Sequence, residues 1–330
     1  MRAPVAAHRK RAHGAPSPAH AYRFEFDAMS SVCEIRLDDA RGEGEPVLAL
    51  AAEQAINEVR RIEVAFSRYR ADSIVSRINA AAGGPDVVGV DDETASLLNF
   101  AAQLHAFSDG LFDITSGVLR RVWDFKAKRV PDEAALQQVL PLIGWSQVEW
   151  TGQTIRLPRA GMEVDFGGFG KEYAADRAMS VLHATGQRHG YVNLGGDIRV
   201  LGPRADGSAW RFGIQHPRQD EGTIASVELR EGALATSGDY ERYFEHEGRR
   251  YCHILDPHTG WPVTHWASVS ITAPACVAAG ALSTIGMLKG ASALEFLAAQ
   301  AATGLVVDTS MRSTRIGAEQ DRRITPGEQE

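Results

Sequence analysis

The sequence predicts an α+β fold in which strands and helices mix within a single domain. Helical and strand-like segments follow one another without the regular βαβ rhythm of a doubly wound sheet. No polar linker or internal repeat divides the 330 residues, whose 44% hydrophobic and 23% charged residues are ordinary for a globular protein. Residues 1–20 lack hydrophobic periodicity and are expected to form a flexible N-terminal tail, which leaves residues 21–330 as the folded domain.

The domain is expected to begin with two strands and a helix. Apolar and polar residues alternate over residues 23–37 and are interrupted at Met29-Ser30-Ser31, which predicts two strands joined by a short turn. Pro46 then opens a segment whose apolar residues recur at helical spacing. This pattern is typical of a helix with one face in the core, formed here by Leu48, Ala52, Ile56, Val59, Ile62 and Phe66.

Four more helices are predicted by apolar periodicity and capping residues, over residues 92–107, 171–185, 274–289 and 292–302. The last three are each followed by a glycine that we expect to cap the helix, namely Gly186, Gly290 and Gly304. Strand-like runs dominate residues 190–254 between them.

Charge and targeting signals exclude several classes of partner. The net charge of -7 repels polyanions, so we expect no nucleic-acid partner, and an anionic nucleotide needs a locally positive pocket. The basic N-terminus has neither a convincing signal peptide nor a lipobox, and the most apolar stretch, residues 275–287, is shorter than the roughly 20 residues of a membrane span. We therefore expect a cytoplasmic protein without membrane insertion. The three separated cysteines are expected to be small hydrophobic residues: Cys33, Cys252 and Cys276.

Five segments carry more glycine, aspartate and hydroxyl residues than packing requires. They are FSRYRADSIVSRIN, SDGLFDITSGVL, VDFGGFGKEYAADRA, YVNLGGDIRVLG and ATSGDYERYFEHEGRRYCHILDPHTGWPV. Each alone has a structural interpretation, because Gly-Gly and Asp-Gly pairs mark turns and an aspartate before a helix is usually an N-cap. Their occurrence together favours a functional site.

The GGFGKE segment is a candidate phosphate site. It is not a Walker loop, because Asp165 stands where the first glycine is required and Glu172 stands where Ser or Thr is required, and it lacks the glycine spacing of a dinucleotide fold. We expect a strand ending at Asp165, glycines that let the backbone approach a ligand, and Lys171 at a helix N-terminus, where a phosphate is favoured. The alternative is that Lys171 is only a solvated first-turn residue.

In this order, the five segments resemble the ApbE family of flavin transferases, most specifically in TSGDY, HILDPHTG and NLGGD. The likeness runs from about residue 26 to residue 290. It implies a magnesium-dependent FAD:protein FMN transferase, which moves FMN from FAD to a Thr or Ser hydroxyl of a target protein and releases AMP. Some members instead hydrolyse FAD to FMN and AMP.

The resemblance also implies which residues form the FAD site. The implied FAD contacts are Met29, Tyr69, Leu111, Phe112, Asp113, Asp165, Lys171 and Ile254. Tyr69 is a plausible partner for a flat ring, although an aromatic at the end of an amphipathic helix is as often in the core. His253 is the candidate for proton transfer, because a neutral imidazole accepts a hydroxyl proton near pH 7; a structural role is the alternative. Asp256 and Thr259 first suggest an Asx-type turn.

The implied Mg²⁺ site departs from the family pattern. The family holds the ion with a backbone carbonyl at the position of Gly168 and with a late helix of pattern A-D-x-x-[SD]-T, whereas this chain has AGALST, with Gly280 in place of the aspartate. Ser283 and Thr284 remain as ligands, so the helix supplies no carboxylate and we expect a weakened Mg²⁺ site. The competing interpretation is that the glycine makes room for a bulky neighbour.

Two other functions stay open from the sequence alone. One is a non-enzymatic FAD-binding protein that has lost the metal site but kept the flavin pocket. The other is an unrelated α+β domain in which the motifs occur by chance. Metal-dependent release of AMP separates the enzyme from the binding protein, and bound flavin separates both from the unrelated domain.

Overall fold

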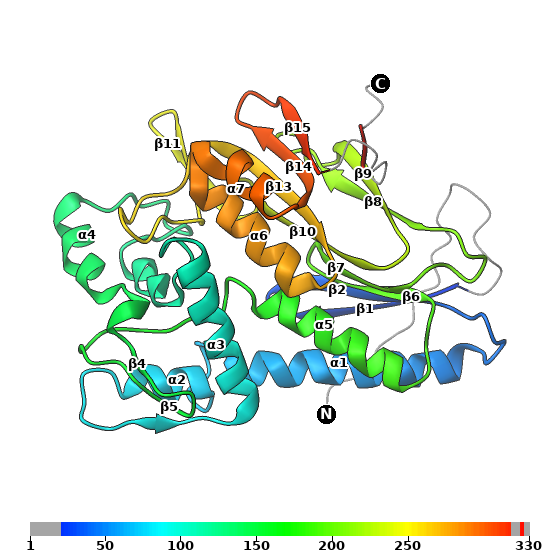
Figure 1. Cartoon of the computed structure of the whole chain (residues 1–330), viewed down its shortest axis with the longest axis horizontal. Coiled ribbons are helices and arrows are strands. Elements are labelled where there is room, and N and C mark those ends of the chain that lie inside the picture. The colour runs from blue at the N-terminus through cyan, green and yellow to red at the C-terminus, as the bar shows by residue number, and fades with distance from the viewer. Residues whose placement is uncertain (1–20, 318–323, 327–330) are drawn as a thin grey trace.

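The computed structural model describes residues 21–317 and 324–326, so the expected tail over residues 1–20 lies outside the described residues. An eight-stranded sheet in which every neighbouring pair is antiparallel forms the centre (Figure 1). Its spatial order is β1 (Ala21–Ala28), β2 (Ser31–Asp38), β6 (Gly190–Leu194), β7 (Asp197–Gly202), β10 (Gly232–Gly238), β13 (Trp266–Ala273), β14 (Thr303–Asp308) and β15 (Ser313–Ile316).

The first two strands form the hairpin that the alternating pattern predicts. Ala28 pairs with Ser31, so Met29 and Ser30 alone make the turn, and both have positive φ angles of 51° and 60°. Such a two-residue turn matches the right-handed twist of the flanking strands. The turn therefore stands at a defined place on the edge of the sheet.

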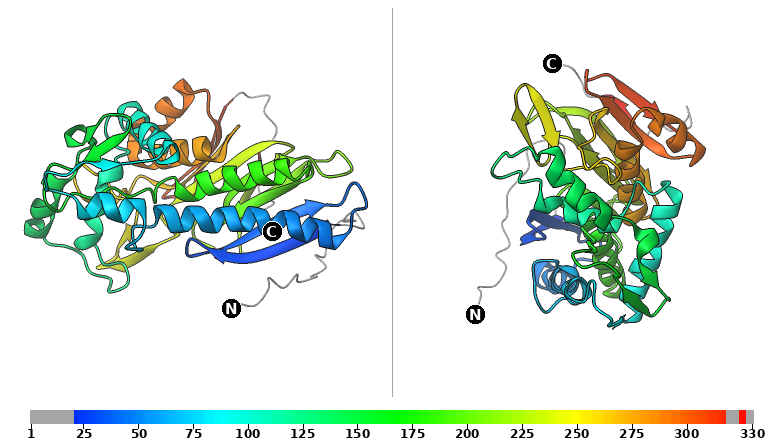
Figure 2. Two further views of the ribbon diagram at one scale, coloured as in Figure 1. Left: turned by 90° about the horizontal axis from the view of Figure 1, so that it is seen from below. Right: turned by 90° about the vertical axis from the view of Figure 1, so that its left-hand side faces the viewer.

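Three helices cover one face of the sheet. The helices α1 (Glu45–Phe66) and α5 (Gly170–Ala184) lie side by side, and α6 (Cys276–Lys289) packs on β10 and β13 (Figures 1 and 2). The apolar stripe that predicts α1 is buried against the sheet, because Leu48, Ile56 and Val59 are almost fully inaccessible. The expected boundaries of α5 and α6 hold within two residues.

A smaller sheet covers the opposite face. It contains β8 (Trp210–Gln215), β9 (Thr223–Leu229) and β16 (Ile324–Pro326). Alternate residues of β8 are buried and pack against Tyr191, Ile198 and Val200 of the central sheet. The period of two gives each strand one face toward this second core.

A mostly helical lobe is inserted between α1 and α5. It contains α2 (Ile74–Ala80), β3 (Val88–Gly89), α3 (Asp92–Phe107), η1 (Ile114–Arg121), α4 (Glu133–Val139), η2 (Leu140–Leu142), η3 (Trp145–Gln147), β4 (Glu149–Trp150) and β5 (Thr154–Arg156). Its core includes Phe112 and Phe169 and continues into Ala281 and Ile285 of α6. The lobe is therefore packed against the helix layer of the central sheet (Figure 1).

The remaining elements correct two expectations. Residues 163–169 have no regular structure, so the strand expected to end at Asp165 is wrong. After η4 (Gly290–Ser292), α7 (Ala293–Ala299) ends with Ala301 in the left-handed region, at φ 50°. Gly304 instead lies in β14, where a side chain would collide with the Ser270 carbonyl, so its expected capping role is also wrong. The hairpin of β11 (Tyr243–His246) and β12 (Arg249–Cys252) completes the described chain.

One helical stretch reaches the length and apolar character of a membrane span. Residues Cys276–Ala299, covering α6 to α7, have a mean hydropathy of 1.3 over their most apolar part. A core helix has the same composition, and α6 packs on β10 and β13 with most of its residues buried. Packing on the sheet therefore accounts for the apolar character of α6.

Candidate active site

Three turns that are distant in sequence meet at the N-terminus of α5. The Lys171 ammonium lies 2.6 Å from Asp197 Oδ2, at the start of β7. Gly195, in the turn between β6 and β7, approaches both the β1–β2 turn and the lysine: a Cβ atom there would lie 2.7 Å from Ser31 Oγ and 3.8 Å from Lys171 Nζ. The sheet topology thus places a cation where the backbone comes close without side chains.

Lys171 is anchored in this cluster by its ion pair with Asp197, although 33% of its side chain is exposed, so it is not a freely solvated first-turn residue. Burial lowers the pKa of Lys171, but the Asp197 and Glu172 carboxylates outweigh burial and raise the pKa above its usual value. The lysine therefore stays charged near pH 7. A fixed positive charge at a helix N-terminus is a suitable receptor for a phosphate.

Glu172 is the unexpected residue of the cluster. Its side chain is buried in the first turn of α5, and Oε2 has no hydrogen-bond partner among the described residues. Burial and the nearby Asp197 raise its pKa to about 8, against the opposing effect of Lys171. In the sequence, Glu172 looks like an ordinary acidic residue at a helix N-terminus, and only the fold shows that its side chain points inward.

Gly280 of α6 faces this glutamate. A Cβ atom at position 280 would lie 2.6 Å from Glu172 Cγ and 2.8 Å from Cδ, and closer still to Oε1. The interpretation that the glycine makes room for a bulky neighbour is therefore confirmed. The Glu172 carboxylate occupies the space next to α6 that an aspartate at position 280 would enter.

Hydroxyl groups cluster one turn further along α6. Ser237 Oγ, near the end of β10, lies 2.8 Å from Ser283 Oγ and 2.9 Å from Thr284 Oγ1. Ser283 also donates to the Gly280 carbonyl at 2.9 Å. The predicted ligands Ser283 and Thr284 therefore lie together, on the same helix as Gly280.

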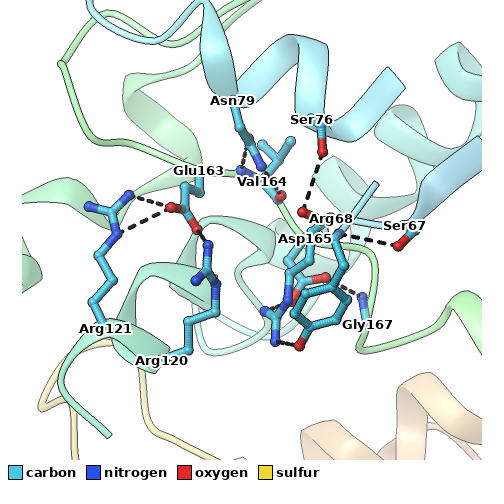
Figure 3. A network of polar contacts seen from close by, with 11 residues as sticks. Ser67, Arg68, Ser76, Asn79, Arg120, Arg121, Glu163, Val164, Asp165 and Gly167 are labelled. Atoms are coloured by element: carbon cyan, nitrogen blue, oxygen red, sulfur yellow. Dashed lines mark hydrogen bonds and ion pairs between the residues drawn. The ribbon is translucent and has the colours of Figure 1, made fainter. Parts of the chain in front are cut away.

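The glycine-rich turn before α5 brings three further predicted residues together (Figure 3). Asp165 accepts hydrogen bonds from Arg68 and from the Gly167 N–H at 3.0 Å, and Arg68 also donates to the Tyr69 hydroxyl at 2.8 Å. Tyr69 is 79% exposed, so the alternative that it is a core aromatic is wrong. Gly168 is exposed beside them, which leaves its backbone accessible. No sequence pattern singled out Arg68.

The side chains of Phe112 and Asp113 in segment 111–113 pack and hydrogen-bond behind the glycine-rich turn. The Phe112 ring is buried against Phe169 and lies under Gly168, where a Cβ atom would be 2.9 Å from the ring. The Asp113 carboxylate accepts from Thr115 and from the Trp145 N–H at 2.8 Å, so its oxygens hold the lobe together. An FAD contact in this segment remains a prediction; the Leu111 and Phe112 N–H groups already donate to Ser108, and the Leu111 side chain is half-buried.

A cavity of about 350 Å³ adjoins this segment. Gly110 meets the DPHTG loop there, since a Cβ atom on the glycine would lie 3.3 Å from His258 Nε2. The predicted Asx turn in this loop is confirmed, because Asp256 Oδ1 accepts from the His258 N–H at 2.8 Å. The cavity is lined by His105, Asp109, Gly110, Asp113, Ile143, Gly144, Ser146, Pro257 and His258.

His253 follows β12 with its imidazole largely buried. Burial and the charges of Arg242 and Lys171 lower its pKa to about 4, so the ring is neutral near pH 7. Its Nδ1 atom is buried and accepts or donates no hydrogen bond within residues 21–317 and 324–326. The side chain of Ile254, the next residue and a predicted FAD contact, lies in the core.

Met29, the predicted FAD contact in the β1–β2 turn, donates its backbone N–H to Glu63 Oε1 at 2.7 Å.

The possible metal ligands near α6 are one carboxylate and several neutral oxygens. In the described part of the chain, no three His, Cys, Asp or Glu side chains are grouped to hold a metal ion. The cluster instead offers the unpartnered Glu172 oxygen, the hydroxyls of Ser283 and Thr284 and the exposed Gly168 backbone. Such a set suits Mg²⁺, which commonly takes one or two carboxylates and completes its shell with water and substrate phosphates.

Comparison with known proteins identifies the family. The ApbE family profile matches residues 29–306. The FAD:protein FMN transferase of Treponema pallidum is 34% identical over 283 residues, covering 79% of this chain and 77% of that protein; the one from Vibrio cholerae serotype O1 is 32% identical over 231 residues, covering 68% and 69%.

Solved structures agree over nearly the whole fold. The crystal structure of the ApbE protein from Thermotoga maritima superimposes with a TM-score of 0.83 at 32% identity, covering 90% of this chain and 97% of that one. The flavinyl transferase ApbE of Pseudomonas stutzeri gives a TM-score of 0.77 at 29% identity, covering 90% and 94%. Because sequence and architecture agree from the first hairpin to β14, this chain belongs to the ApbE family.

Proposed function

We propose that this chain is an FAD:protein FMN transferase, which moves FMN from FAD to a Thr or Ser hydroxyl of a target protein. The observation that carries the proposal is the charged Lys171, fixed by Asp197 where two glycine-containing turns reach the N-terminus of α5. The two relatives named above, which align with this chain over more than two thirds of their own length, are FAD:protein FMN transferases. The lysine and the helix N-terminus together would bind the FAD pyrophosphate.

The proposed step exchanges the phosphoanhydride bond of FAD for a phosphoester bond to the acceptor. The acceptor hydroxyl oxygen forms a bond to the FMN phosphorus, and the bond from that phosphorus to the bridging oxygen of the pyrophosphate breaks. AMP leaves with this oxygen, and the acceptor's proton passes to a base. Such reactions depend mainly on positioning and on neutralising charge at the phosphate oxygens.

His253 would receive the proton. Its imidazole is neutral near pH 7, and its buried Nδ1 has no hydrogen-bond partner in the described chain. Burial is the main cause of the lowered histidine pKa, and the charges of Arg242 and Lys171 add to it. Exposed Tyr69, steadied by Arg68, would contact the flat rings of FAD.

We further propose that the enzyme uses Mg²⁺. When bound, the ion would neutralise charge on the pyrophosphate oxygens. The unpartnered Glu172 oxygen and the hydroxyl cluster on α6 support this, and Gly168, Ser283 and Thr284 are the proposed ligands from the family pattern. The carboxylate facing Gly280 argues against a site weakened for lack of negative charge.

The test is to incubate the purified protein with FAD and Mg²⁺, with and without an acceptor protein. Chromatography would measure FMN and AMP, and in-gel fluorescence would detect flavin bound covalently to the acceptor. Transfer predicts AMP in a one-to-one ratio with bound flavin, whereas hydrolysis predicts free FMN. Flavin binding without AMP release, in the presence of Mg²⁺ and acceptor, would support the non-enzymatic binding protein instead.

A further inference from the structure

We propose that Glu172, on α5, supplies the carboxylate ligand of the metal site in place of an aspartate at position 280 on α6. The inference rests on the proposed Mg²⁺-dependent function. It assigns a specific role to a residue that the sequence pattern does not single out, and it reinterprets Gly280 as an adaptation rather than a loss.

The contact between the two helices carries the first step. Position 280 is turned toward Glu172, with the hypothetical Cβ only 2.6 Å from Cγ and 2.8 Å from Cδ of the glutamate. A side chain at position 280 and the Glu172 carboxylate therefore compete for the same volume. With glycine at 280, a carboxylate reaches this volume from α5 instead of from α6.

The state of the Glu172 carboxylate carries the second step. It is buried, and Oε2 has no hydrogen-bond partner in the described structure. Lys171, the adjacent cation, forms its ion pair with Asp197 instead. A buried carboxylate is costly unless it is paired or coordinates a metal ion. Because Lys171 is already paired with Asp197, a divalent cation would supply the partner that the Glu172 carboxylate lacks.

The neighbouring oxygens carry the third step. Thr284 lies four residues beyond Gly280, so both positions are on one face of α6, and Ser283 Oγ is bonded to the Gly280 carbonyl at 2.9 Å. Ser237 Oγ joins the two hydroxyls from β10. A glutamate oxygen next to Gly280 therefore stands beside the hydroxyls of the proposed site. Oxygen donors of this kind suit Mg²⁺ or Mn²⁺.

The test measures metal binding directly, using Mn²⁺ as a spectroscopic substitute for Mg²⁺. Electron paramagnetic resonance and titration calorimetry, in saturating FAD, would give the Mn²⁺ dissociation constant of the native protein and of Glu172→Gln. We expect the variant to bind Mn²⁺ at least tenfold more weakly, because its amide keeps the shape but loses the charge. Glu228→Gln, at an exposed position of β9, removes the same charge elsewhere and should bind as the native protein does.

A helix exchange tests the shared volume. Glu172→Ala combined with Gly280→Asp moves the carboxylate back to α6, and we expect it to regain most of the Mn²⁺ affinity lost in Glu172→Ala alone. If Glu172→Gln binds Mn²⁺ as tightly as the native protein, the inference is overturned while metal-dependent function stands. If the native protein binds FAD but no Mn²⁺, the proposed metal dependence fails with it. Melting temperatures of each variant without FAD or metal show whether a loss of Mn²⁺ affinity comes from unfolding.

Discussion

At the scale of single residues, the site depends on charges that the fold holds in fixed pairs. Lys171 faces a ligand site and also neutralises Asp197, which is buried. Its removal therefore has two consequences, one for ligand binding and one for folding. Glu172, the next residue, is also buried, but one of its carboxyl oxygens has no hydrogen-bond partner among the described residues, and burial raises its pKa.

Replacing Lys171 with alanine should weaken FAD binding by roughly tenfold to a hundredfold, since a hydrogen bond to a charged group contributes about 1.5–3 kcal/mol. It should also lower the free energy of unfolding by about 1–3 kcal/mol, because Asp197 loses its partner. Adding Asp197→Asn should restore stability but not affinity. Calorimetric titration with FAD and urea unfolding measure both effects; native affinity in Lys171→Ala would refute the phosphate role.

His253→Gln should lower the rate of FAD cleavage by roughly 10²–10⁴-fold with little change in FAD affinity. Because the folded-state pKa of His253 is depressed from 6.5 to about 4, the folded protein binds fewer protons than the unfolded chain between these values. This histidine thus contributes stability above about pH 6.5, which is lost as pH falls toward 4.

The same variant tests the depressed pKa. In urea unfolding at a series of pH values, the loss of stability between pH 6.5 and 4 should be smaller in His253→Gln than in the native protein. His265→Gln is a suitable control, because it removes a histidine outside the proposed site. Parallel stability curves for native protein and His253→Gln would contradict the burial argument, whatever the change in rate.

At the scale of elements, the close approach of α5 and α6 explains Gly280. Glycine inside a helix costs about 1 kcal/mol relative to alanine, so on helix propensity alone Gly280→Ala should stabilise the protein. We expect it instead to destabilise by about 1–3 kcal/mol, because its Cβ would meet the Glu172 side chain.

Relief of that contact should restore stability. The double variant Gly280→Ala with Glu172→Ala is expected to lose less free energy of unfolding than the two single variants lose in sum. A double-mutant cycle measures this difference. Gly170→Ala is the matched control, since a Cβ atom at this first residue of α5 meets nothing within 4 Å. A stabilised Gly280→Ala single variant would contradict the proposed conflict.

At the scale of the whole molecule, the site is assembled from parts that pack as separate cores. The central sheet supplies Asp197 and Ser237, the helix layer supplies Lys171 and Thr284, and the inserted lobe approaches through Gly168 and Phe112. The lobe core continues into α6. A ligand that spans these parts therefore stabilises the complete fold.

Saturation with FAD should raise the melting temperature in a single transition. At a free FAD concentration of 100 times the dissociation constant, binding contributes about 2.7 kcal/mol, which corresponds to roughly 4 °C for a protein of this size. EDTA should remove the part of the shift that depends on Mg²⁺, while added AMP alone should give less. Differential scanning calorimetry provides the measurement, and a shift insensitive to both Mg²⁺ and EDTA would argue against a metal that bridges protein and FAD.

The sequence by itself determined several of the main elements and the family. Alternation at residues 23–37 predicts the first hairpin, and apolar spacing predicts α1 and α3, because these patterns record which side chains face the core. Ordered motifs around Lys171, Asp239 and His253 predict the ApbE family, which the comparisons confirm. Local chemistry is enough for such conclusions.

Only the tertiary structure decided what surrounds each candidate residue. Lys171 and Asp197 are 26 positions apart, and Glu172 and Gly280 more than 100, so no local pattern shows that either pair meets. The sequence suggested that an aspartate was missing from α6, whereas the fold places a carboxylate from α5 in its space. The physical reason is that a binding site depends on the space and the charge around each residue. Both are set by elements that are distant in sequence and meet only when the chain packs.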